Sequence, residues 1–191
     1  MRSQVTTGRG DEGMTVALDG REYSKAHPIM ECVGTLDELR TQLALARLLL
    51  LRETLPEAQA LADTITWLLH VFFAIGAECS DPLNRKPEFH RARIGEQHLA
   101  HLEAEQQRLE SQVQLPRKFI VGAANLPAAQ MDVACAVARR FERNLVRLKN
   151  EVPEFSAGEL LAFINRLSDF LYVAARWLDN GDYQTVDYSR L

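Results

Sequence analysis

The chain has 191 residues, of which 47% are hydrophobic, so it is long enough to bury a substantial apolar core. Its formal net charge of −4 does not provide the basic surface that nucleic acids or anionic membranes attract, and we expect neither as a partner. The three cysteines are far apart and form no CxxC pair, which argues against a disulfide framework. The first residues lack the apolar run of a signal peptide, so we expect one cytoplasmic domain, residues 1–191.

Three glycines fall within the ten residues 6–15, TTGRGDEGMT, in a chain that is otherwise poor in glycine. Glycine permits positive φ angles, and consecutive backbone N–H groups can form a concave anion site, so this segment has the features of a phosphate-binding loop. A mobile tail is the alternative, because terminal segments are often disordered. The segment alone does not decide between the two.

Apolar residues recur at helical spacing in five later segments, which predicts five helices of about five turns each. The expected helices span residues 34–53, 56–79, 94–113, 127–150 and 156–179. The run KFIVGA at 118–123 has strand-forming residues but is too isolated to make a sheet. Short connections between long helices are typical of an up-and-down bundle, so we expect an all-α, five-helix fold.

Capping signals refine the ends of two of these helices. Thr35 and Glu38 stand in capping-box spacing at the start of the first helix, as do Ser156 and Glu159 at the start of the fifth. Asn180, followed by glycine, is a good terminator for the fifth helix.

Charged residues in the fourth segment, ARRFERNLVR, allow two interpretations. Arg139 and Arg143 share a helix face, and Glu142 lies three residues after Arg139, so the group is consistent with an exposed ladder of intrahelical ion pairs. The alternative is a clamp for a polyanion, because planar guanidinium groups match phosphate oxygens and the glutamate can orient them. In the fifth segment, Asn165 and Asp169 are either polar contacts between helices or part of such a site.

A metal centre is the usual alternative function of a helical bundle. Carboxylate-bridged di-iron bundles use Glu-x-x-His pairs, and none of the five histidines has a glutamate three residues earlier. We therefore expect no metal ligand from the protein. His70, within the apolar run WLLHVFF, is interpreted as a core residue.

Several segments agree in order and spacing with one known family. The stretch Thr7 to Thr15 follows an N-terminal Thr-x-Thr-Gly-Asp-x-Gly-x-Thr loop, with Arg9 in place of the second threonine. ECVGTLDEL, FFAIGAECSDP, ARRFER and FINRLSDFLYVAAR match later motifs. Over nearly its whole length the chain resembles the PduO-type ATP:cob(I)alamin adenosyltransferases, which load the adenosyl group onto vitamin B12.

The resemblance implies a homotrimer of five-helix bundles that binds ATP and the corrinoid between subunits. It implies that the loop at about residues 5–25 binds ATP, that Mg²⁺ arrives through the ATP phosphates, and that Arg139, Asp37 and Phe119 are catalytic. Phe119 takes the place of an aromatic residue on the lower face of the corrin, where displacement of the axial ligand makes cobalt easier to reduce. The residues expected around ATP are Thr7, Gly8, Arg9, Gly10, Thr15, Val16, Lys25, Arg139, Arg140, Glu142, Arg143 and Asn165.

The chemistry implied by the resemblance needs no protein base. Reduced cobalt is itself the nucleophile, attacks C5′ of ATP and expels triphosphate, so the protein supplies alignment and stabilises charge on the leaving group. A reductase that supplies cob(I)alamin, or a B12-dependent enzyme that accepts the product, is an expected partner.

Three departures from the family pattern bear on function. Cys135 occupies the place of an arginine that forms an intersubunit ion pair with the aspartate matched by Asp37. FIVGAA replaces Phe-Ile-Leu-Pro-Gly-Gly, and Ala26-His27 replaces Asp-Asp. The loss of the arginine leaves Asp37 unpaired, protonated or paired with another cation. Two functions therefore remain open: an active adenosyltransferase, in which Cys135→Arg would raise activity, and a non-catalytic ATP- or corrinoid-binding regulator or carrier.

Overall fold

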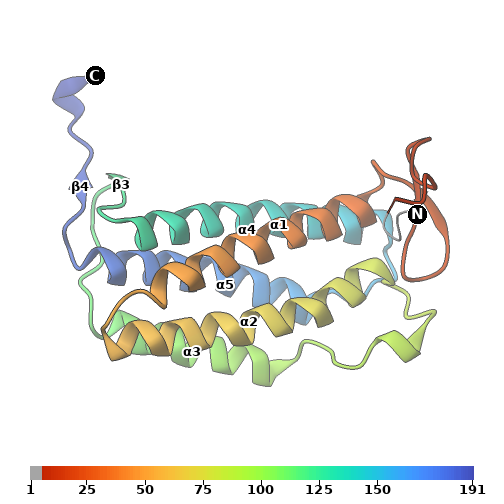
Figure 1. Ribbon diagram of the computed structural model, residues 1–191, viewed down its shortest axis with the longest axis horizontal. Coiled ribbons are helices and arrows are strands. Elements are labelled where there is room, and N and C mark those ends of the chain that lie inside the picture. The colour runs from red at the N-terminus through yellow and green to blue at the C-terminus, as the bar shows by residue number, and fades with distance from the viewer. Residues whose placement is uncertain (1–5) are drawn as a thin grey trace.

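The protein is a bundle of five long helices, described by a computed structural model over residues 6–191 (Figure 1). The helices are α1 (Pro28–Leu50), α2 (Pro56–Ser80), α3 (Glu96–Glu110), α4 (Leu126–Glu151) and α5 (Gly158–Asp179). Consecutive helices run in opposite directions, α4 packs against both α1 and α5, and α3 packs against α5. The expected all-α, five-helix fold is confirmed. Residues 1–5, including the first residue of the expected ATP loop, lie outside the described residues.

The first helix begins at Pro28, six residues before the expected start at residue 34. Pro28 occupies its first turn, and the ring Nδ1 of His27 accepts a hydrogen bond from Ile29 N at 3.2 Å. Thr35 therefore lies inside the helix, where its hydroxyl donates to the carbonyl oxygen of Glu31 at 2.7 Å. The capping-box prediction was wrong because His27 and Pro28 supply an earlier start.

The fifth helix also departs from its predicted start but ends where expected. Its N-cap is Ala157, which provides no side-chain cap, so Ser156 and Glu159 do not form the predicted capping box. At its other end Asn180 adopts a left-handed conformation with φ of 49°, which terminates the helix as the sequence predicted.

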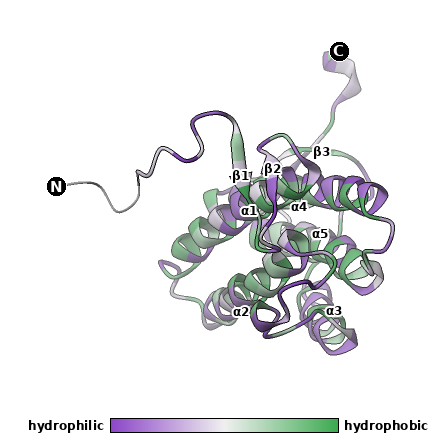
Figure 2. Ribbon diagram, turned by 90° about the vertical axis from the view of Figure 1, so that its right-hand side faces the viewer, coloured by the Kyte–Doolittle hydropathy of each residue, from purple (hydrophilic) through white to green (hydrophobic). Residues whose placement is uncertain are grey.

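Two short strand pairs accompany the helices. The strands β1 (Met14–Val16) and β2 (Glu22–Ser24) form an antiparallel hairpin at the end of the bundle that faces the viewer in Figure 2. The strand β3 (Ile120–Gly122) pairs with β4 (Gln184–Thr185) near the C-terminus. The expectation that KFIVGA stays unpaired was therefore wrong, because its partner is a segment more than 60 residues away that carries little strand signal. Short 3₁₀ helices span Pro87–Phe89 and Tyr188–Arg190.

The core lies between the helices and consists of leucine, isoleucine, alanine and phenylalanine side chains. Among the described residues, α2 is the one helix long and apolar enough to cross a membrane by length and composition. Its side chains Leu61, Ile65, Leu68 and Phe72 are buried in the bundle core, which accounts for that composition.

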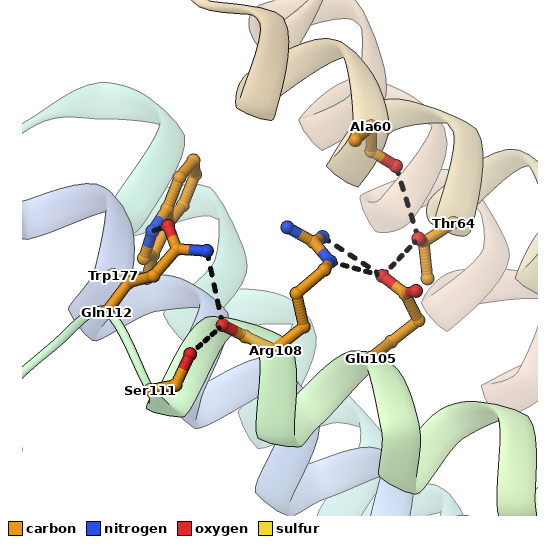
Figure 3. Close-up of polar contacts among 7 residues, drawn as sticks. All are labelled: Ala60, Thr64, Glu105, Arg108, Ser111, Gln112 and Trp177. Atoms are coloured by element: carbon orange, nitrogen blue, oxygen red, sulfur yellow. Dashed lines mark hydrogen bonds and ion pairs between the residues drawn. The ribbon is translucent and has the colours of Figure 1, made fainter.

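Polar contacts fasten α3 to its neighbours (Figure 3). The Glu105 carboxylate accepts hydrogen bonds from Arg108 on the same helix and from Thr64 of α2, at 3.0 and 3.1 Å. Just beyond α3, the side-chain oxygen of Gln112 accepts a hydrogen bond from the Trp177 indole of α5 at 3.1 Å. These contacts link α3 to α2 and to α5 at the end of the bundle opposite the glycine-rich loop.

Candidate functional site

The glycine-rich segment folds into successive tight turns before it enters β1. Asp11 N donates to Gly8 O at 3.3 Å, and Gly13 N donates to Gly10 O at 3.2 Å. Gly8 and Gly13 have φ angles of 73° and 80°, a region that residues with a Cβ rarely adopt. The segment is exposed and projects outward from the bundle (Figure 2), so its backbone groups are accessible to a ligand or a neighbouring chain.

Lys25 closes this loop from the far strand of the hairpin. Its backbone N–H donates to Gly13 O at 2.8 Å, and its Nζ donates to Gly10 O at 2.7 Å. A Cβ on Gly10 would lie 2.8 Å from that Nζ, so any larger residue there would displace the ammonium group. The lysine therefore holds its positive charge over the turn, bound to a carbonyl oxygen.

The hairpin that carries Lys25 is fixed to the bundle by a short polar network. The carboxylate of Asp19 accepts hydrogen bonds from Arg21 N at 2.9 Å and from the Tyr23 hydroxyl at 2.7 Å. Leu18 N donates to the hydroxyl of Ser80, at the end of α2, at 2.9 Å. These bonds fix the base of the hairpin, while residues 6–13 extend away from it.

His27 accounts for one departure from the family pattern. Its ring caps α1 and lies 4.5 Å, between centroids, from the ring of Tyr23. An aspartate at this position would be a favourable N-cap, and the imidazole nitrogen supplies the same acceptor. The change to histidine therefore keeps the entry into α1.

Arg139, Glu142 and Arg143 of α4 form no ladder of ion pairs within residues 6–191. The Glu142 carboxylate accepts a hydrogen bond from the Asn165 amide of α5 at 3.2 Å. Arg139 and Arg143 are exposed, and neither has a carboxylate partner within residues 6–191. Asn165 is exposed as well, so its bond to Glu142 is a polar contact between helices at the surface of the bundle. Two unneutralised guanidinium groups beside an oriented carboxylate and amide favour binding of a polyanion.

Arg140 lies on another side of α4. It pairs with Glu38 of α1, which is partly exposed like the arginine itself. The remaining residues expected around ATP, namely Thr7, Gly8, Arg9, Gly10, Thr15 and Val16, lie in the exposed loop and in β1. Within one chain the loop sits at one end of the bundle, whereas Arg139 lies halfway along α4 (Figure 1).

Asp37 lies on an exposed face of α1, next to an apolar groove. Its side chain is 64% exposed and accepts from Arg40 Nε at 3.3 Å. The Arg40 guanidinium in turn lies 5.6 Å from the ring centroid of Phe73, a side chain that is 68% exposed. The groove has a volume of about 290 Å³ and is also lined by Leu36 and Gly76. Asp37 therefore pairs with Arg40 of its own chain.

Cys135 is buried between α4 and α5. Its thiol donates to the carbonyl oxygen of Ser168 at 3.2 Å, and the residue is 5% exposed. The position held by an arginine in the family pattern is thus a small, buried thiol here.

Phe119 stands at the entrance to β3 as one of the most exposed aromatic residues of the chain, at 78%. Its carbonyl oxygen accepts a hydrogen bond from Val186 N at 2.8 Å, so the C-terminal segment fixes its backbone. The ring itself is left free to contact a ligand or another chain.

A buried charged group at the end of α5 was not among the residues expected from the sequence. Arg176 of α5 is 1% exposed and binds Asp179 and Asp132, and Asp179 also accepts from Ala124 N. The only available signal was the three-residue spacing of Arg176 and Asp179, which is also common on exposed helices.

Histidines and carboxylates provide no metal centre in the described part of the chain. Residues 6–191 contain no group of three or more His, Cys, Asp or Glu side chains that could hold a metal ion. His70 is exposed, so its interpretation as a core residue was wrong, because it falls on the outer face of α2. All three cysteines are free thiols, as their spacing predicted.

Comparison with known proteins places these features in one family. Residues 5–178 match the model of the cobalamin adenosyltransferase family. A cobalamin adenosyltransferase from Cupriavidus metallidurans is 34% identical, over 93% of this chain and 89% of its own length. The corrinoid adenosyltransferase PduO of Citrobacter freundii is also 34% identical over 94% of this chain. The chain spans about half the length of that relative, with 51% covered.

Solved structures agree in fold. A phenylalanine-to-histidine variant of the PduO-type ATP:corrinoid adenosyltransferase from Lactobacillus reuteri, complexed with cobalamin and ATP, superposes with a TM-score of 0.82. The match covers 97% of this chain and 96% of that one, at 24% identity. With the family model matching most of its length and a relative of similar size at 34% identity, the chain belongs to the cobalamin adenosyltransferase family.

Proposed function

We propose that the protein transfers the 5′-deoxyadenosyl group of ATP to cob(I)alamin, forming adenosylcobalamin and releasing triphosphate. The observation that carries this proposal is the pair of exposed, unneutralised arginines, Arg139 and Arg143, beside the Glu142–Asn165 contact in a chain of this family. A triphosphate carries several negative charges, and planar guanidinium groups bind its oxygens with two hydrogen bonds each.

The glycine-rich loop supplies the second half of the ATP site. Lys25 Nζ, bound to a carbonyl oxygen, can exchange this contact for a phosphate oxygen at little electrostatic cost. The turns at Gly8 and Gly13 leave backbone N–H groups in an exposed segment, where they can donate to phosphate. We also assign Thr7, Arg9, Thr15 and Val16, which lie in the same loop and in β1, to the ATP site.

The reaction is a displacement at carbon. The cobalt of cob(I)alamin attacks C5′ of ATP, the cobalt–carbon bond forms, and the C5′–oxygen bond breaks with its electron pair passing to triphosphate. The contribution of the protein is to hold the two substrates in line and to stabilise the charge that accumulates on the leaving group. We assign the second task to Arg139, Arg143 and Lys25.

Magnesium fits this scheme as an ion that arrives with the nucleotide. The described residues contain no three-residue cluster of metal-ligating side chains, and Glu142 already accepts a hydrogen bond from Asn165. Mg²⁺ commonly keeps several waters and binds through substrate phosphates, so a dedicated protein cage is not required. When bound, it would neutralise part of the triphosphate charge.

The corrinoid side of the site is assigned to Phe119 and Asp37. The exposed ring of Phe119 is suited to lie against the flat face of a corrin, and a solved relative, a phenylalanine variant, binds cobalamin together with ATP. Asp37 borders an apolar groove with Phe73, where a large macrocycle or a neighbouring subunit can be seated.

We infer a cytoplasmic homotrimer with sites between subunits. The loop projects from the bundle and lies at its end, whereas Arg139 lies halfway along α4, so a site that uses both is assembled most simply from two chains. The exposed Phe73 and its groove supply an apolar contact surface. Cob(I)alamin must be generated by a one-electron reduction of cob(II)alamin, so a reductase is the expected partner.

A second candidate function is a non-catalytic regulator or carrier that binds ATP or corrinoid. The specific observation in its favour is Cys135, buried on the carbonyl of Ser168 where the family pattern has an arginine. Asp37 then lacks that partner and pairs with Arg40.

An anaerobic assay with ATP and chemically reduced cob(I)alamin separates the two candidates. Formation of adenosylcobalamin by the purified protein supports the enzyme, and Arg143→Ala should lower kcat/KM for ATP by about 10- to 100-fold, the loss of a charge-assisted contact. Lys149→Ala removes an exposed cation from the same helix and should leave the rate unchanged. Binding of both substrates without product would favour the carrier.

A further inference from the structure

The buried guanidinium of Arg176 joins the end of α5 to α4. Its Nε donates to Asp179 Oδ2 at 2.9 Å, and its Nη2 donates to Asp132 Oδ2 of α4 at 2.7 Å. The guanidinium carbon also lies 5.3 Å from the ring centroid of Tyr172. Arg176 and Asp179 are 1% and 2% exposed, so this is a fully desolvated charge pair with defined geometry.

The second carboxylate oxygen of Asp179 binds a residue outside α5. Oδ1 accepts a hydrogen bond from the backbone N–H of Ala124, 55 residues earlier in the chain, at 2.7 Å. The neighbouring Asn125 donates from its amide to the carbonyl oxygen of Leu178 at 2.8 Å. The segment between β3 and α4 is therefore attached to the last turn of α5 by two adjacent contacts.

A carboxylate in the last turn of α5 is electrostatically unfavourable for the helix, so the stability of the helix itself does not account for Asp179. The C-terminal end of a helix carries a partial negative charge, which disfavours an acidic residue in the last turn. Asp179 is the last residue of α5, and it is buried. Its pairing with Arg176 through Oδ2 offsets that cost and leaves Oδ1 to accept from the loop.

The segment held in this way carries Phe119. Beyond the Asp179 contact, Phe119 is restrained by the short β3–β4 pairing and by the hydrogen bond from Val186 N to its carbonyl oxygen. Val121 is 69% exposed, so packing holds the segment weakly. Glycine and alanines at 122–124 stand where the family pattern has proline and two glycines, and they leave the backbone without a proline restraint.

We propose that Arg176 and Asp179 are positioning residues that hold the Phe119 segment at the lower face of the corrinoid. This inference rests on the proposed function, because it gives Phe119 its ligand. Arg176 holds the Asp179 carboxylate in place through Oδ2. The other oxygen, Oδ1, accepts from Ala124 N and so sets the distance between the end of α5 and the backbone at residue 124. Loss of this contact releases the phenylalanine while the ATP side of the site stays intact.

Two variants test the contact from its two sides. Asp179→Ala removes the acceptor but also leaves Arg176 with Asp132 alone, which can impair folding. Ala124→Pro removes the donor N–H, adds a restraint on φ at residue 124, and keeps the buried ion pair. Ala124→Ser retains the N–H and serves as the conservative variant. Glu103→Gln disrupts a different α5 ion pair, with Arg166 at 2.9 Å, and serves as a control for general loss of α5 contacts.

The expected result is selective for the corrinoid. Ala124→Pro and Asp179→Ala should weaken equilibrium binding of cobalamin by about tenfold, the scale of one charge-assisted hydrogen bond, with ATP affinity within about twofold of the wild type. Electron paramagnetic resonance of bound cob(II)alamin should show a larger fraction with the axial nitrogen still coordinated. Ala124→Ser and Glu103→Gln should behave as the wild type.

The outcomes separate this proposal from the proposed activity. Wild-type cobalamin affinity and an unchanged cob(II)alamin spectrum in a folded Ala124→Pro protein would overturn the positioning role. Equal losses of ATP and cobalamin affinity would also overturn it, since they indicate a general structural defect. A wild-type protein that binds cobalamin but forms no adenosylcobalamin from cob(I)alamin and ATP contradicts the proposed activity alone, and the comparison of the variants still decides the positioning role.

Discussion

The thiol of Cys135 lies 3.2 Å from the carbonyl oxygen of Ser168, in the buried seam between α4 and α5. Burial raises the pKa of this thiol, so the group is a neutral, weak donor that fills a small space. The position that carries an arginine in the family pattern is therefore packed for a small side chain in this protein.

Replacement of Cys135 by arginine is expected to destabilise the protein. The larger side chain must displace its neighbours in a seam where the present residue is 5% exposed, at a cost of about 1–3 kcal/mol in the free energy of unfolding. This revises the sequence-based expectation of higher activity, because Asp37 is exposed and already paired with Arg40. Urea denaturation measures the change, with Cys135→Ala as control. An unchanged midpoint together with faster turnover would show that the arginine is accommodated.

Removal of the Thr35 hydroxyl should weaken the contact between α1 and α4. This hydroxyl accepts a hydrogen bond from the Asn144 amide at 2.8 Å, and both residues are buried. Thr35→Val leaves the amide with only a long contact to Glu31, at 3.5 Å, so we expect a loss of about 1–3 kcal/mol in the free energy of unfolding. Thr35→Ser keeps the hydroxyl and should lose much less. A loss in Thr35→Val no larger than that in Thr35→Ser would show that the hydroxyl contact to Asn144 does not stabilise the fold.

Lys25 is expected to affect ATP use without affecting stability. Lys25→Ala should lower kcat/KM for ATP by about 10- to 100-fold, because an ammonium group aimed into the loop is lost. The side chain is exposed, so the unfolding midpoint should change little. Steady-state kinetics at saturating cob(I)alamin measure the effect, and Arg52→Ala, an exposed cation just beyond α1, provides the control. A kcat/KM for ATP equal to that of the wild type would show that Lys25 does not belong to the ATP site.

Asp81 should make the stability of the protein depend on pH in the acidic range. Burial by itself would raise the pKa of this carboxyl, but hydrogen bonds from Arg85 N and Lys86 N, both at 2.8 Å, and from His90 outweigh burial and lower the pKa. The unfolded chain then binds the proton more tightly than the folded one. The stabilisation is present above the unfolded pKa of about 4 and is lost as the pH falls through the folded pKa.

The test of this dependence compares the wild type with Asp81→Asn. We expect the variant to be less stable at pH 7, because the charge that accepts these bonds is gone, and the difference should shrink as the pH falls below about 4. Free energies of unfolding measured by denaturation across that range provide the comparison. A difference that stays constant with pH would mean that the charge of Asp81 does not stabilise the fold.

Much of the fold follows from local patterns in the sequence. The helical periodicity of apolar residues predicts all five helices, and Asn180 predicts the end of α5, because both signals depend on residues a few positions apart. The residues expected to bind ATP came from the match of motifs to a family, and their role in this chain stays a prediction. The start of α1 was misplaced because a capping pair also occurs by chance inside a helix, and the start of α5 because its N-cap is Ala157, one residue after Ser156.

The tertiary structure decided which polar residues meet. Glu142 binds Asn165, and Cys135 is buried on Ser168, and neither contact follows from helical spacing alone. The attachment of Ala124 to Asp179 joins residues 55 positions apart. The sequence by itself determined the helices and their apolar faces, because these depend on neighbours within a few residues. Only the packed bundle decided the partners of each charge, because these depend on how the helices are set against one another in space.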